Sequence, residues 1–172
     1  MRKFSSTLAL ALLASLLLAA CGFKLRGTGP QDPLPFSTIF LGFSETSPLG
    51  VQLRRNLNAM GNVRVVQTRQ EADAILEVVR EAKEKQILSL NSQGRVREYN
   101  LFYRLSFRVV DRQGRQLLAP NEVAIRRVQS YNEAQALAKE VEEAQMYQEM
   151  QTDLVQQVLR RISAIKPLAP AE

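Results

Sequence analysis

Residues 96–110 read VREYNLFYRLSFRVV, and this stretch decides the fold class. Apolar or aromatic side chains occupy every second position, and mostly polar side chains lie between them. The alternating apolar set is Tyr99, Leu101, Tyr103, Leu105, Phe107 and Val109. A strand with this period of two buries one face and leaves the other in water, which is typical of an antiparallel sheet. The sequence therefore predicts a long strand in a sheet that is covered on one face only.

Turn sequences lie on both sides of this strand. Residues 91–94 (NSQG) precede it and residues 111–114 (DRQG) follow it, and Asn, Asp and Gly favour tight turns between antiparallel strands. Residues 116–129 then return as a partner strand. Proline cannot donate a hydrogen bond to a sheet, so we expect Pro120 at an edge or a bulge.

Residues 74–90 predict a third strand, on the other side of the first turn. It is apolar at each end, but its middle (REAKEK, 80–85) is charged. We expect this middle part to project from the core or to form a bulge, because unpaired charges are costly to bury.

The chain before residue 74 predicts a strand, a helix and a second strand. Residues 36–43 (FSTIFLGF) and 63–67 (VRVVQ) are the strands. Ser47 followed by Pro48 is a helix N-cap with proline in the first turn, and Gly61 is a natural C-cap. The apolar face of the helix comprises Leu49, Leu53, Leu57 and Met60. Short connections predict a right-handed βαβ unit.

A long amphipathic helix is predicted from Asn132 to about Ile165, because no glycine or proline interrupts the pattern before Pro167. Its apolar stripe is Leu137, Val141, Ala144, Tyr147, Met150, Leu154, Val158, Ile162 and Ile165. We expect this stripe to pack into the core. The predicted fold is therefore α+β: a mixed, largely antiparallel sheet of four to five strands with two helices packed on one face, in the order β-α-β-β-β-β-α.

The N-terminus predicts export and lipid attachment. Arg2 and Lys3 precede an apolar run at residues 8–20, which is shorter than the ~20 residues that a membrane-spanning helix needs. Small residues lead directly to Cys21, the only cysteine in the chain. This is typical of a lipoprotein signal, although an ordinary secretory signal or a buried helix remains an alternative. Two or three acyl chains on Cys21 hold a protein stably at a membrane.

The expected organisation follows from these elements. It comprises a cleaved signal peptide (1–20), the lipidated Cys21 with its tether (21–35), a single domain (36–166) and a short tail (167–172). Without Arg2 and Lys3 the formal charge falls from +6 to +4, so the protein is only mildly basic and nucleic acid is not an expected partner.

Several function classes are disfavoured. The chain has no histidine, the usual general base and commonest metal ligand, and it lacks the nucleotide-binding and nucleophile motifs. Acidic residues on the long helix are interpreted as a solvated face. We therefore expect no enzyme, no cofactor and no metal site, although a periplasmic enzyme with paired carboxylates or a Ser-Lys arrangement remains an alternative.

The motif CGFKLRG at 21–27 resembles the start of the LPS-assembly lipoproteins of the LptE family. The resemblance continues through the βαβ unit, Glu98-Tyr99, ALAKE at 136–140 and MQTDLVQQVLRRI at 150–162, so it spans nearly all of the mature chain. It implies a lipoprotein of the outer membrane that faces the periplasm, lies inside the lumen of the LptD β-barrel and helps that barrel assemble. Gly22, rather than Asp, after the cysteine agrees with an outer-membrane address.

The resemblance also implies binding of lipopolysaccharide during its transport to the outer leaflet. Lipopolysaccharide carries phosphates, which basic side chains on exposed loops can hold. The candidates are Arg95 and Arg97, just past the turn at 91–94, and Lys139, which lies within the ALAKE motif; ordinary surface charges are the alternative. A second hypothesis is a generic lipoprotein that binds a small lipid or hydrophobic ligand without a barrel partner.

Overall fold

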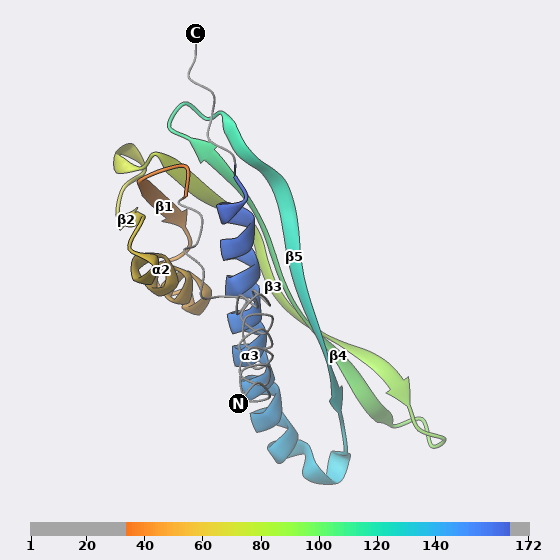
Figure 1. The fold of residues 1–172 in the computed structure, drawn as a ribbon. Coiled ribbons are helices and arrows are strands. Elements are labelled where there is room, and N and C mark those ends of the chain that lie inside the picture. The colour runs from red at the N-terminus through yellow and green to blue at the C-terminus, as the bar shows by residue number, and fades with distance from the viewer. Residues whose placement is uncertain (1–33, 166–172) are drawn as a thin grey trace, which may run out of the picture. The chain divides into compact units, whose positions relative to one another are not determined.

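The computed structural model describes residues 34–165, so the predicted signal peptide, Cys21 and the tail at 167–172 lie outside the described residues. The elements are β1 (Thr38–Gly42), α2 (Pro48–Met60), β2 (Arg64–Val66), β3 (Ala74–Leu90), β4 (Val96–Asp111), β5 (Gln116–Ser130) and α3 (Ala136–Ser163), with 3-10 turns at Arg69–Glu71 and Glu133–Gln135. Their order and the α+β class confirm the predictions (Figure 1).

The five strands form one mixed sheet in the order β2-β1-β3-β4-β5. β1 runs parallel to both β2 and β3, and the remaining pairs are antiparallel. The parallel neighbours β1 and β2 are connected through α2, which confirms the βαβ unit. β1 pairs only with Ala74–Glu77 of β3, so the rest of β3 continues with β4 and β5 as a three-stranded extension.

We call the far part of this extension the distal end. It comprises residues 85–100 of the β3–β4 hairpin and residues 127–143, from the end of β5 to the first turns of α3. Figure 1 shows both segments at the same end of the sheet, opposite the connection between β4 and β5.

Local sequence sets the limits of α2 as predicted. The Ser47 hydroxyl oxygen accepts a hydrogen bond from the Gly50 amide at 3.2 Å, which satisfies one of the free donors of the first turn. Gly61 ends the helix with a φ of 72°, a left-handed conformation that costs glycine little. These caps leave Leu53 and Leu57 facing the core.

Both helices cover the same face of the sheet, as predicted (Figure 1). The largest fully buried side chains come from both layers: Tyr103, Phe107, Ile39, Leu49, Leu53, Leu57, Leu76, Leu101, Leu105, Met150, Leu154 and Ile162. Leu34 and Phe36 already belong to this core, so the end of the predicted tether joins the folded domain.

A bulge in β3 changes which of its residues face the helices. The β3–β4 ladder skips Val79, and before this point Leu76 and Val78 lie on the helix-covered face. Beyond it, Lys83 and Lys85 pair with Tyr103 and Leu101, whose side chains face the same side. The predicted irregularity therefore exists, but it precedes the charged middle of the strand, which stays within the ladder.

Pro120 also lies where it was expected. β5 is an edge strand, and its register with β4 shifts between the pairs Phe107–Asn121 and Val109–Leu118. Pro120 falls within this irregular segment, where its missing amide hydrogen leaves no gap in the ladder.

The prediction that the whole apolar stripe of α3 packs into the core is wrong for its first turns. Leu137 is 77% exposed and Val141 is 68% exposed, and Ala144 is exposed as well. The first fully buried residue of α3 is Met150. The physical reason is that the sheet beneath the start of α3 presents polar side chains such as Lys85, so the helix turns its own charged residues toward it.

Candidate functional site

The distal end brings the three predicted ligand-binding residues to one part of the molecule. Arg95 closes the turn between β3 and β4, Arg97 lies at the start of β4, and Lys139 lies in the first turn of α3. The Tyr131 amide donates to the Arg97 carbonyl at 2.8 Å, and the Lys139 ammonium donates to the Ser130 hydroxyl at 3.1 Å. The end of β5 therefore connects the hairpin to α3.

Arg95 and Arg97 are both exposed. They line a small open cleft with Asn91, Tyr131 and Glu133. The Arg95 guanidinium lies 3.4 Å from the Glu133 carboxylate, but both side chains are about 70% exposed, so this ion pair holds Arg95 only weakly. The two guanidinium groups can therefore reach an anion that approaches the cleft.

Lys139 is held much more firmly than the arginines. Its side chain is only 16% exposed, and its ammonium contacts the Glu142 carboxylate at 2.7 Å. The Gln129 side-chain amide also donates to the Lys139 carbonyl at 2.7 Å. Lys139 therefore anchors the start of α3 to β5, and it can contact a phosphate only beside, or in place of, Glu142.

Two lysines of β3 lie over tyrosine rings between the sheet and α3. The Lys83 ammonium lies 4.9 and 5.3 Å from the ring centres of Tyr103 and Tyr147, and the Lys85 ammonium lies 4.3 and 5.9 Å from those of Tyr99 and Tyr131. These contacts use all four tyrosines of the chain. The sequence did not predict this cluster of two lysines and four tyrosines. The lysines face the helix only because of the bulge at Val79, and the sequence does not reveal where that bulge lies.

The hydroxyls of Tyr103 and Tyr147 stay protonated. Burial raises the pKa of Tyr103, and its hydrogen bond to the Glu81 carboxylate at 2.7 Å raises it further. Burial also raises the pKa of Tyr147, with the nearby carboxylates of Glu143 and Glu84 adding to the effect. Tyr147 donates to the Glu84 carbonyl at 3.0 Å and so holds α3 to the sheet, whereas the hydrogen bond from Tyr103 joins β4 to β3.

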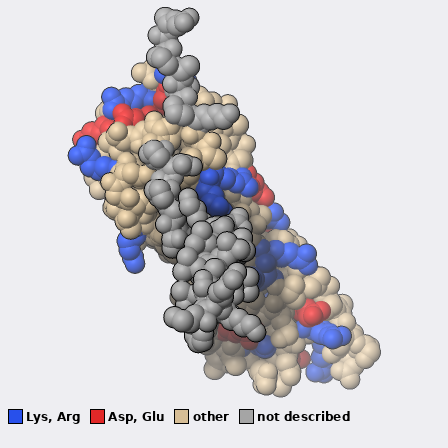
Figure 2. Space-filling view, viewed as in Figure 1, with Lys and Arg blue, Asp and Glu red and all other residues tan. Residues whose placement is uncertain are grey.

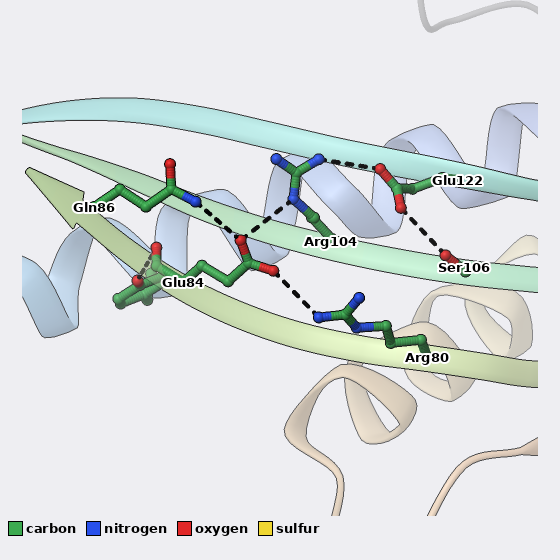
Figure 3. A network of polar contacts seen from close by, with 7 residues as sticks. Arg80, Glu84, Gln86, Arg104, Ser106 and Glu122 are labelled. Carbon is green, nitrogen blue, oxygen red and sulfur yellow. Dashed lines mark hydrogen bonds and ion pairs between the residues drawn. The ribbon is translucent and has the colours of Figure 1, made fainter. Parts of the chain in front are cut away.

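The face of the sheet that the helices leave uncovered carries a row of charged and polar side chains (Figure 3). Its members are Arg80, Glu84, Gln86, Arg104, Ser106 and Glu122. The Arg104 guanidinium lies 3.1 Å from the Glu122 carboxylate and 3.8 Å from that of Glu84. Arg80 completes the row at 3.4 Å from Glu84. Because acidic and basic groups alternate across the three strands, this face suits water or a polar protein surface.

A second group of ion pairs continues on this face nearer to β1. The Glu77 carboxylate lies 2.6 Å from the Arg108 guanidinium and 2.9 Å from that of Arg69. The hydrogen bond from Arg108 holds the pKa of Glu77 below its usual range. Glu77 therefore remains charged at neutral pH and at mildly acidic pH.

A family model described as LptE, lipopolysaccharide-assembly, matches residues 36–162, which is nearly the whole described domain. The chain belongs to the LptE family. Two relatives are the LPS-assembly lipoproteins LptE of Pectobacterium atrosepticum and Yersinia enterocolitica. The first is 33% identical over 89% of this chain and 82% of the relative, and the second is 31% identical over 89% and 73%. The resemblance stated from the sequence is thus confirmed.

Solved structures of similar lipoproteins support this LptE assignment. The solution structure of lipoprotein B from Nitrosomonas europaea is 38% identical, with a TM-score of 0.69 over 83% of this chain and 91% of that chain. The crystal structure of a minor lipoprotein from Acinetobacter baumannii is 27% identical, with a TM-score of 0.64 over 81% and 100%. Each match covers more than four fifths of this chain.

Membership in the LptE family makes this chain a lipopolysaccharide-assembly lipoprotein. The family is defined by assembly rather than by a reaction, which confirms the prediction that the chain is not an enzyme. Within residues 34–165, neither α2 nor α3 is long and apolar enough to cross a membrane.

Proposed function

We propose that this chain is an outer-membrane lipoprotein, anchored through acyl chains on Cys21 after removal of residues 1–20. It plugs the lumen of the LptD β-barrel, helps that barrel assemble, and binds lipopolysaccharide on its way to the outer leaflet. The observation that carries this proposal is the LptE family match over residues 36–162. The fold agrees with it, because a plug needs a rigid filled domain and no catalytic group.

The uncovered sheet face supports the role as a plug. The lumen of a membrane β-barrel is polar, so a protein inside it needs a polar surface. The alternating row of Arg80, Glu84, Arg104 and Glu122 supplies such a surface over three strands (Figure 3). Each of these side chains already has a partner within the sheet, which keeps the face rigid without a barrel.

The three basic residues of the distal end support binding of lipopolysaccharide. A guanidinium can hold one phosphate through two parallel hydrogen bonds, which suits exposed Arg95 and Arg97. Lys139 adds a third positive charge at the same end. Its carboxylate partner Glu142 keeps this lysine in place until a more highly charged phosphate competes for it.

The alternative of a generic carrier for a small hydrophobic ligand requires an enclosed apolar cavity. In the described part of the chain, the space between the sheet and the helices is filled by large side chains such as Tyr103, Phe107 and Met150. The cleft between α2 and α3 opens to solvent and carries polar groups such as Gln52 and Gln151. We therefore retain the plug as the proposed function.

The proposal is tested with the variant Arg95→Glu/Arg97→Glu/Lys139→Glu. It should bind lipopolysaccharide at least tenfold more weakly than the parent and should still copurify with LptD, since the plug surface is unchanged. The matched control is Arg55→Glu/Arg64→Glu/Arg160→Glu, which reverses three exposed charges elsewhere on the domain. Equal binding by the two variants would identify Arg95, Arg97 and Lys139 as ordinary surface charges. Failure of the parent to copurify with LptD would contradict the role as a plug.

A further inference from the structure

The first turns of α3 lie against the sheet without contributing to the core. Between Ala136 and Gln145 no residue is buried, and Met146 is the first side chain of α3 that packs against the core. The second half of the helix differs, because five of its side chains, beginning with Met150, are buried. We call residues 136–145 the N-terminal segment of α3. Burial of apolar side chains therefore holds only the second half of the helix in place.

The N-terminal segment is joined to the sheet by polar contacts. In the described chain, only Lys139 and Glu143 of this segment make a hydrogen bond or an ion pair to the sheet. The Glu143 carboxylate lies 2.5 Å from the Lys85 ammonium, and the Lys139 ammonium donates to the Ser130 hydroxyl at 3.1 Å. The Gln129 side-chain amide donates to the Lys139 carbonyl at 2.7 Å. Figure 2 shows acidic and basic side chains next to one another at the lower end of the view, where Figure 1 shows the start of α3. Salt weakens ion pairs of this kind.

Local features also make the closure of this segment weak. Gln135 at the N-cap position provides no side-chain hydrogen bond to the helix, and the first turn contains no acidic residue to interact with the helix dipole. The Gln129 side chain beneath the segment is 1% exposed, yet its Oε1 atom has no hydrogen-bond partner among residues 34–165. A buried oxygen without a partner destabilises the closed state, because water can reach it when the segment opens.

We propose that the N-terminal segment of α3 is a lid that opens from the sheet while the rest of the domain stays folded. Opening frees the Lys85 ammonium from Glu143 and exposes the Gln129 side chain to water. The surface beneath the lid also contains the rings of Tyr99 and Tyr131, over which Lys85 lies. The distal end can therefore present two different surfaces to a partner. The lid is independent of the proposed function, because it follows from packing alone.

Hydrogen exchange of the full lipoprotein in phospholipid nanodiscs, followed by mass spectrometry, measures the opening of each half of α3. Relative to unstructured peptides, the backbone amides of residues 140–145 should exchange about a hundredfold faster than those of residues 154–163. Raising the salt from about 0.1 M to about 1 M shortens the screening length from about 10 Å to about 3 Å. This change should speed exchange of the lid roughly threefold further and leave the second half of the helix unchanged.

The variant Lys85→Met removes the ion pair to Glu143 and keeps a long side chain at this position. It should speed exchange of the lid about fivefold and leave the second half of α3 unchanged. The matched control is Arg127→Met, which removes an ion pair of similar length, 2.6 Å, between β5 and Asp153 in the second half of α3. This control should leave both halves within about twofold of the parent, because buried side chains hold the second half of the helix.

A second variant tests the same ion pair from the helix side. Glu143→Gln should speed exchange of the lid as Lys85→Met does, and the double variant should add little to either, because both remove one interaction. If Lys85→Met unfolds the whole domain, as circular dichroism would show, Glu143→Gln decides the question. Equal protection of the two halves of α3 in the parent would overturn the lid. Exchange of residues 140–145 that responds neither to salt nor to Glu143→Gln would overturn it as well.

Discussion

Replacement of Leu154 by alanine tests whether the second half of α3 closes the core. Leu154 is completely buried among the side chains of the sheet and α2. Truncating a buried leucine removes its transfer free energy and leaves a cavity, which typically costs 2–5 kcal/mol. We therefore expect the free energy of unfolding to fall by about 3 kcal/mol.

Leu137→Ala is the matched control, because it makes the same change on the same helix. Leu137 is 77% exposed, so its truncation should change the free energy of unfolding by less than about 0.5 kcal/mol. Substitution with alanine also has little effect on helix propensity, since leucine and alanine are both good helix formers. The difference between the two variants in free energy of unfolding therefore measures how much the packing of Leu154 contributes to stability.

Urea unfolding of the mature lipoprotein, followed by far-UV circular dichroism, measures both variants. With a denaturant slope of about 2 kcal/mol/M, Leu154→Ala should lower the midpoint by about 1.5 M, while Leu137→Ala should leave it within about 0.3 M of the parent. Equal shifts in the two variants would refute the reasoning, because they would mean that both halves of α3 are packed alike.

The remaining predictions concern caps, charge and the anchor. Ser47→Ala should cost about 1 kcal/mol of stability, measured by urea unfolding, because the hydrogen bond to the Gly50 amide is lost. Gly61→Ala should cost about 1–2 kcal/mol in the same assay, because a side chain at a φ of 72° is strained. The lowered pKa of Glu77 stabilises the fold above the ordinary value of 4.5, and this contribution is lost as the pH falls through the lowered pKa. Stability should therefore fall more steeply below about pH 4.5 in the parent than in Glu77→Gln, and equal slopes would contradict this. Cys21→Ala should release the protein from membranes without unfolding the domain, as fractionation and circular dichroism would show.

The regular elements of this fold could be predicted because each leaves a local signal. The alternation at residues 96–110 identifies β4, and Ser47, Pro48 and Gly61 mark the limits of α2. Turn residues between the long strands identify both hairpins. These signals depend on backbone geometry within a few residues, so a single sequence contains them.

The errors arise where the outcome depends on distant contacts. Periodicity shows that Leu137 and Val141 share a side of α3, but it cannot show that polar side chains of β3 and β5 lie beneath this part of the helix. The bulge at Val79 could not be predicted for the same reason, because it depends on how β3 and β4 pair rather than on local sequence. Without it, Lys83 and Lys85 would not face the tyrosines.

The candidate site was predictable only as a set of residue types. Exposed arginines after a turn and a lysine in a family motif suggested phosphate binding, but strand order decides whether they meet. The structure places Arg95, Arg97 and Lys139 at one end because β5 returns beside β4 and delivers the chain to α3 there. Two exposed apolar residues at this end, Leu137 and Val141, are predicted by the periodicity of α3 to lie in the core, and the structure places them in solvent.

The length of the three-stranded extension beyond Glu77 determines how far the turn at 91–94 lies from the core. Lengthening β3 and β4 by two residues each would move the turn at 91–94 about 7 Å farther from the core, at about 3.4 Å per residue. Each side chain would keep its face of the sheet, whereas an insertion of one residue would reverse them all. The distance between the core and the distal end can therefore change in steps during evolution, while the packing around Leu154 stays the same.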